Sequence, residues 1–151
     1  MEALGSRNQH RARAGGGAGV TTRTAACCCR QLTATCTGEP LYTAVCHCLE
    51  CQRRTGSAFG AGAFYAVGSV KLEGAATSFV RIGDEGSHIT FRFCPVCGTT
   101  ISWENMPGLI AIAVGAFADP AFPAPRASMY HESRRHPWVA IETGAPLEKH
   151  G

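Results

Sequence analysis

Cysteine is the residue type whose spacing in this chain most directly implies chemistry. Seven of the nine cysteines lie in three short clusters. The clusters are Cys27 with Cys29, then Cys46, Cys48 and Cys51, and finally Cys94 with Cys97. Dense cysteine in a chain without an export signal indicates metal binding rather than disulfide bonds, and closely spaced thiolates are typical zinc ligands. Cys28 and Cys36 remain as spare thiols.

The first and last clusters together supply four ligands. Two residues separate Cys94 from Cys97, and Gly98 directly after them permits a positive φ, so both sulfurs can face one point. Cys27 and Cys29 would share a face of an extended chain, because side chains alternate along a strand. We therefore assign these four cysteines to one closed structural zinc site, since a tetrahedral structural site needs four ligands.

The middle cluster has three cysteines, Cys46, Cys48 and Cys51. Three ligands leave the fourth tetrahedral position for water or a substrate, as in catalytic zinc sites. The prediction is two zinc ions per chain, and His47 is expected to point away from the open site. The alternatives are a single metal or a redox pair at Cys94 and Cys97, although the βαβ pattern that accompanies such pairs is not visible.

The segments that must position these cysteines are short and β-like. The sequence predicts strands at Arg30–Thr37, Leu41–Cys46, Ala58–Val67, Val70–Glu73, Ser78–Ile82, His88–Phe93, Thr99–Trp103 and Leu109–Val114. Residues 83–86 are a turn that predicts a hairpin, and a helical turn is expected only within Glu50–Ser57. Short strands at regular spacing indicate a mostly β fold built from antiparallel strands.

Composition and charge place the domain within the chain. Residues 1–24 have no hydrophobic period and are predicted to be a disordered tail, residues 25–145 a zinc domain, and residues 146–151 a C-terminal tail. Charged residues make up 17% of the chain, below the ~25% of an average globular protein, which favours one domain with a real core. The net charge of +3 lies within residues 1–26, which disfavours nucleic-acid binding by a folded basic face.

The sequence also lacks membrane and export signals. The longest apolar run, Leu109 to Ala118, has about ten residues, whereas a membrane-spanning helix needs ~20. No continuous apolar stretch of the kind found in secretory signals lies near residue 1. We therefore expect a cytoplasmic protein without membrane partners.

Several motifs together resemble one family. They are, in order, Cys27-x-Cys29, Gly38-Glu39-Pro40, Cys46-His47-Cys48-x-x-Cys51-Gln52-Arg53-Arg54-Thr55-Gly56-Ser57 and Phe93-Cys94-x-x-Cys97-Gly98-Thr99. This combination, over about residues 25 to 140, resembles the glutathione-dependent formaldehyde-activating (Gfa) family, which includes the centromere protein V type. The chain departs from the family at Arg30, where a glycine usually follows the first cluster.

The resemblance implies a β-tent fold with a structural zinc at Cys27, Cys29, Cys94 and Cys97 and a catalytic zinc at Cys46, Cys48 and Cys51. It also implies a carbon–sulfur lyase that forms or cleaves S-(hydroxymethyl)glutathione, or a related thiol adduct, from glutathione and formaldehyde. Arg53 and Arg54 are the candidates to pair with glutathione carboxylates. The alternative is a non-catalytic zinc-stabilised binding module, or a thiol or metal sensor.

Overall fold

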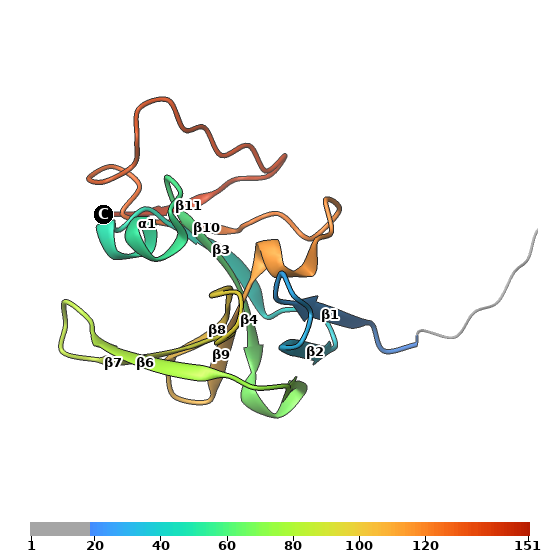
Figure 1. Cartoon of the computed structure of the whole chain (residues 1–151). Coiled ribbons are helices and arrows are strands. Elements are labelled where there is room, and N and C mark those ends of the chain that lie inside the picture. Colours follow the sequence, from blue (N-terminus) through green and yellow to red (C-terminus); the bar gives the residue numbers. More distant parts are fainter. Residues whose placement is uncertain (1–18) are drawn as a thin grey trace, which may run out of the picture.

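The computed structural model describes residues 19–151, which form two β-sheets and one short α-helix (Figure 1). The small sheet has the strand order β1-β2-β5, with strands β1 (Thr22–Ala26), β2 (Thr33–Thr37) and β5 (Val70–Glu73). The large sheet has the order β11-β10-β3-β4-β9-β8-β7-β6. Its strands are β3 (Tyr42–Cys46), β4 (Gly60–Ala66), β6 (Thr77–Ile82), β7 (His88–Phe93), β8 (Thr100–Met106), β9 (Leu109–Ala113), β10 (Ala127–Met129) and β11 (Glu148–His150).

The connections explain how the sheets are arranged. The helix α1 (Leu49–Thr55) lies between β3 and β4, and 3₁₀ turns occupy Val67–Ser69 and Val114–Phe117. All pairs are antiparallel except β10, which runs parallel to both β3 and β11. In the view of Figure 1, α1 and the β6–β7 hairpin lie on the left and the small sheet lies on the right. The mostly β prediction is confirmed.

The hydrophobic core lies between the small sheet and the middle of the large sheet. It brings together residues of β1, β2, β4, β8 and β9, and its largest fully buried side chains include Leu32, Tyr65, Ile101 and Ile112. Burying an aliphatic or aromatic side chain of this size contributes roughly 1.5–3 kcal/mol. This contact between the sheets therefore fixes the orientation of the strands that also carry the cysteines.

The opposite face of the same large sheet is the wall of a cavity. Along β4, Ala63 and Tyr65 are in the core, while Gly62 and Phe64 line the cavity, as strand alternation requires. The ring of Trp103 lies against the backbone of Gly62, since a Cβ built there would be 2.6 Å from the Trp103 ring. A glycine at this position is what lets the indole ring approach the backbone so closely.

A β-bulge in β8 gives Ile101 and Trp103 opposite directions. Arg92 pairs with Ser102 but Phe93 pairs with Thr100, so Ile101 is the extra residue. Without the bulge, Ile101 and Trp103 would share one face, because they are two residues apart. With it, Ile101 enters the core and Trp103 lines the cavity.

Most predicted strands are present, and two of them, Val70–Glu73 and His88–Phe93, have the predicted bounds. The predicted helical turn is also present, as α1. Three strands were missed: β1, β10 and β11. The boundaries at 25 and 145 stay predictions, although β1 begins at Thr22 and β11 lies within the proposed C-terminal tail. The predicted disorder of residues 1–18 lies outside the described residues.

We expect Gly62→Ala to destabilise the protein by about 1–3 kcal/mol, because the new methyl group overlaps the Trp103 ring. The measurement is urea unfolding followed by circular dichroism, with the wavelength of Trp103 fluorescence in a Trp138→Phe background as a second readout. The control is Gly68→Ala, since a Cβ at Gly68 meets nothing within 4 Å. Equal stability of the two variants would contradict the packing described here.

Candidate metal centres

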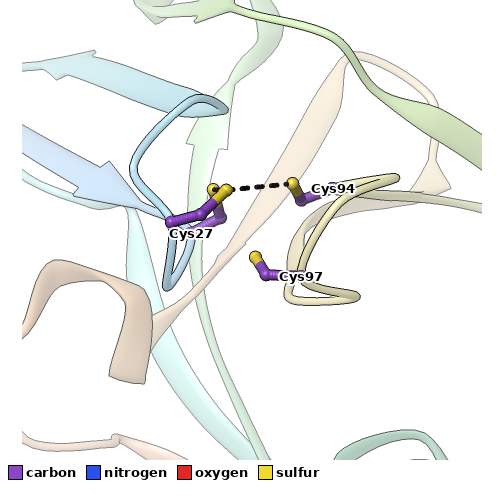
Figure 2. A group of neighbouring side chains, drawn as sticks. Cys27, Cys94 and Cys97 are labelled. Carbon is purple, nitrogen blue, oxygen red and sulfur yellow. Dashed lines mark hydrogen bonds between the residues drawn. The ribbon is translucent and has the colours of Figure 1, made fainter.

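Four cysteines from two turns converge in a first cluster. Cys27 and Cys29 lie just after β1, and Cys94 and Cys97 lie between β7 and β8. Figure 2 shows Cys27 facing Cys94 and Cys97 across the gap between these turns. The four sulfurs all lie within 4.8 Å of one another, and all four cysteines are free.

The sulfur spacing fits a metal and does not fit disulfide bonds. Cys29 Sγ lies 3.5 Å from Cys27 Sγ and 3.6 Å from Cys94 Sγ. A tetrahedral zinc with Zn–S bonds of ~2.3 Å separates its sulfurs by about 3.8 Å, whereas a disulfide joins them at about 2.05 Å. These four residues therefore could hold a metal ion.

Hydrogen-bond donors surround this first cluster, as negatively charged sulfurs require. The backbone N–H of Leu32 donates to Cys27 Sγ at 3.3 Å, and the side-chain amide of Gln31 donates to Cys94 Sγ at 2.8 Å. The hydroxyl of Thr99 lies 3.3 Å from Cys97 Sγ, and its hydrogen bond lowers the pKa of Cys97 to about 5. These contacts favour the thiolate form that binds metal.

The two turns of this cluster share one backbone hydrogen-bond pattern and a positive φ at the residue after the second cysteine. Cys94 N–H donates to Thr99 C=O, and Gly98 follows the second cysteine with a φ of 75°. Cys27 N–H donates to Leu32 C=O, and Arg30 follows the second cysteine with a φ of 65°.

The expectation that Cys27 and Cys29 lie on an extended chain is wrong, because β1 ends at Ala26 and a turn follows. The two sulfurs are brought together by this turn and not by strand alternation. The grouping of the four cysteines does not change.

The second cluster is built where β3 passes into α1. Cys46 ends β3, Cys48 is the N-cap of α1, and Cys51 lies in its first turn. Their sulfurs lie within 4.8 Å of one another, and Cys51 N–H donates to Cys48 Sγ at 3.3 Å. Hydrogen bonds from the Cys46 and Cys51 thiols lower the pKa of Cys48 to about 2. This cluster too could hold a metal ion.

Polar side chains form hydrogen bonds to His47, which lies between Cys46 and Cys48 in the second cluster. His47 is fully buried, and its Nε2 lies 3.1 Å from Ser128 Oγ, which in turn lies 2.8 Å from His131 Nδ1. Burial lowers the pKa of both His47 and His131, which favours neutral rings. His47 is engaged by this chain of hydrogen bonds and is not among the clustered ligands. The side-chain amide of Gln52 adds a bond to His47 C=O at 2.8 Å.

The second cluster opens onto a cavity of about 300 Å³. All three of its cysteines belong to the cavity lining, whereas none of the four cysteines of the first cluster does. The rest of the lining includes the aromatic residues Phe64, Phe91, Trp103 and Tyr130 and the arginines Arg54, Arg81 and Arg134. The two clusters therefore differ in their surroundings, since Cys46, Cys48 and Cys51 border the cavity and the other four cysteines do not.

The two arginines predicted to bind substrate occupy different places. Arg54 lines the cavity, and its guanidinium carbon lies 4.5 Å from the centre of the Trp103 ring and 5.4 Å from that of Phe91. Arg53 is exposed, is paired with Glu50 on the helix surface, and is not part of the lining. Arg81, which was not predicted from the sequence, also lines the cavity, although it lies 30 residues after Cys51 in sequence.

The two spare cysteines lie outside both clusters. Cys36 is fully buried in the core, and burial raises its pKa to about 11. Cys28 is exposed, and its backbone N–H donates to Thr99 Oγ1 at 3.2 Å.

Within residues 19–151, no helix has the length and apolar character needed to cross a membrane.

Comparisons with known proteins found one family model and one similar solved structure. A family model described as glutathione-dependent formaldehyde-activating enzyme matches residues 22–133. A crystal structure of a Rhodobacter sphaeroides protein is similar with a TM-score of 0.49 and 14% identity, over 83% of this chain and 98% of that chain. No curated protein matches this chain.

We expect Arg30→Gly to stabilise the protein by about 0.5–1 kcal/mol, because the left-handed conformation is costly for any residue with a Cβ. The measurement is urea unfolding of the metal-loaded protein. Arg30→Ala is the matched control, since it removes the same side chain and keeps the Cβ. If both variants gain equally, loss of the arginine side chain and not backbone strain accounts for the change.

Replacing one cysteine of each cluster is expected to separate the two sites. Cys97→Ser breaks the four-cysteine cluster and is expected to unfold much of the domain, because structural metal sites contribute folding energy. Cys48→Ser is expected to lose one metal and keep the fold. Elemental analysis and circular dichroism measure both effects, with Cys28→Ser as a control that keeps full metal content. Equal loss of structure in Cys97→Ser and Cys48→Ser would contradict the difference between the clusters.

Proposed function

Because the chain belongs to the glutathione-dependent formaldehyde-activating family, we propose that it is a carbon–sulfur lyase of that type. It joins the sulfur of glutathione, or of a related thiol, to the carbon of formaldehyde, and it splits the same bond in reverse. The observation that carries the proposal is the position of Cys46, Cys48 and Cys51 on the wall of a cavity. A reactant in the cavity can reach that wall, whereas the other four cysteines lie outside the cavity lining.

The donor sets fit zinc in both clusters. Four thiolates suit a closed structural ion, and three suit an ion with one free position. We propose Cys27, Cys29, Cys94 and Cys97 for the structural zinc and Cys46, Cys48 and Cys51 for the catalytic zinc. When bound in the second cluster, zinc supplies the positive charge that favours the thiolate form of a sulfur entering from the cavity.

The cavity residues have separate roles in this reaction. The thiolate sulfur attacks the formaldehyde carbon, and the carbonyl oxygen takes up the proton that the thiol lost, so atoms and charge balance. Phe64, Phe91 and Trp103 form an apolar wall that limits water around the reacting atoms. Gly60 leaves room beside Arg54 and Cys51, because a Cβ there would be 2.8 Å from Arg54 Nη2 and 3.3 Å from Cys51 Cβ.

Tyr130 is the residue that we propose as the hydrogen-bond donor to the substrate oxygen. It follows Met129, which pairs with Cys46 across β10 and β3, and its side chain lines the cavity. Burial raises the pKa of Tyr130, so its hydroxyl keeps a proton at neutral pH. Its backbone has a φ of 53°, a conformation that costs free energy and often occurs at functional sites.

The test is the rate at which glutathione and formaldehyde exchange with S-(hydroxymethyl)glutathione, measured by NMR exchange spectroscopy. We expect the rate to rise in proportion to the concentration of zinc-loaded protein. Cys51→Ser is expected to abolish the increase, and Cys28→Ser, in which a cysteine outside both clusters is replaced, is expected to keep it. A rate that stays at the spontaneous value for every protein concentration would contradict lyase activity and favour a binding or sensing module.

Cobalt substitution provides a second readout that does not depend on turnover. Millimolar glutathione is expected to shift the thiolate-to-cobalt charge-transfer band if a thiol enters the free position. The shift is expected in the wild-type protein and in Cys28→Ser. An unchanged band in both proteins would count against thiol binding at the second cluster.

A further inference from the structure

We propose that Arg54 and Arg81 form a carboxylate-binding subsite beside the second cysteine cluster, so that the cavity selects thiols that carry a carboxylate. Arg54 comes from α1 and Arg81 from β6, and both side chains line the cavity that borders Cys46, Cys48 and Cys51. The selection of a thiol rests on the proposed function. The carboxylate contact does not, and it can be tested separately.

The two arginines differ from the other arginines nearby in having no acidic partner. Arg134 lies 3.7 Å from Asp84, and Arg53 is paired with Glu50. Within residues 19–151, neither Arg54 nor Arg81 forms a salt bridge. Glu50, Asp84 and Glu85 also line the cavity, but within residues 19–151 no carboxylate lies within salt-bridge distance of either guanidinium group.

Their hydrogen-bonding groups are also left without partners. The Nε atoms of Arg54 and Arg81 are both buried, and neither has a hydrogen-bond partner. Arg81 makes one long contact, from Nη1 to Ile82 C=O at 3.4 Å. A buried donor without a partner is costly, and a carboxylate that accepts from such donors removes that cost.

Two aromatic rings contact the guanidinium group of Arg54 beside the second cluster. Its guanidinium rests against Trp103 and Phe91, which leaves its N–H donors, arranged around the rim of the planar group, free to bind. A Cβ built on Gly60 would lie 2.8 Å from Arg54 Nη2 and 3.6 Å from Cys51 Sγ. The arginine and the cysteine are therefore close neighbours, and one small molecule can contact both.

The cavity size limits which thiol can use this subsite. About 300 Å³ lies at the lower end of the range for small-molecule sites, which suits a short peptide or amino-acid thiol and not a protein chain. The competing explanation is that both arginines only offset the negative charge of the cysteines. In that case the cavity would bind a thiol equally well with or without a carboxylate.

The experiment compares glutathione with its diethyl ester, which has the same thiol and no free carboxylate. Binding to the zinc-loaded full chain is followed by Trp103 fluorescence in a Trp138→Phe background, since the chain has two tryptophans and Trp138 is exposed. We expect glutathione to bind at least about tenfold more tightly than the diester. Arg54→Gln and Arg81→Gln are each expected to reduce that ratio to near one.

Arg53→Gln is the matched control, because it removes the neighbouring charge of the same helix and lies outside the lining of this cavity. Its ratio is expected to equal that of the parent. Equal affinity of the parent for glutathione and its diester would overturn the proposal. A loss in Arg53→Gln as large as in Arg54→Gln and Arg81→Gln would also overturn it, as would a Trp103 signal that responds to neither ligand.

S-methylglutathione separates this inference from the proposed function, because its carboxylates are free and its sulfur is blocked. Binding that falls by about tenfold in Arg54→Gln and Arg81→Gln supports the subsite even if glutathione leaves the cobalt spectrum unchanged. Binding that is insensitive to both substitutions overturns the subsite, whatever the cobalt spectrum shows.

Discussion

Mutual repulsion among sulfur anions is the constraint on which the rest of this structure depends. Four cysteine sulfurs lie within 4.8 Å of one another in the first cluster, and Cys29 and Cys94 are 65 residues apart in sequence. Four thiolates at that spacing repel one another strongly unless a cation lies between them. A metal ion in this position would join the turn after β1 to the turn between β7 and β8, and so tie one sheet to the other.

The large sheet then serves two purposes with the same strands. One face of β4, β8 and β9 packs against the small sheet, and the other face of β4 and β8 forms a wall of the cavity. The bulge at Ile101 is what allows β8 to contribute a core residue and Trp103 from positions two residues apart. Stability and site geometry are therefore coupled, because a shift of either strand changes both the core and the cavity.

Much of this arrangement could be predicted from the sequence, because cysteine spacing constrains geometry strongly. The division of seven cysteines into a group of four and a group of three is confirmed, although the turn at Cys27 was mistaken for extended chain. The turn was missed because residue 30 is an arginine. A glycine at this position would have indicated a positive φ. The strands β10 and β11 have three residues each, which is too short for a visible alternation. Arg81 was missed because its proximity to the cysteines depends entirely on how the sheet folds.

The two glycines of β4, Gly60 and Gly62, limit how substitutions can change the size of the cavity. Gly60 and Gly62 both border the cavity, and an added Cβ at either position meets neighbouring atoms within 3 Å. Glycine is already the smallest residue, so substitution at these positions can only fill the space and never enlarge it. Natural or engineered variants that accept bulkier molecules must therefore obtain the room by shortening larger lining side chains, such as Phe64, Phe91 or Trp103.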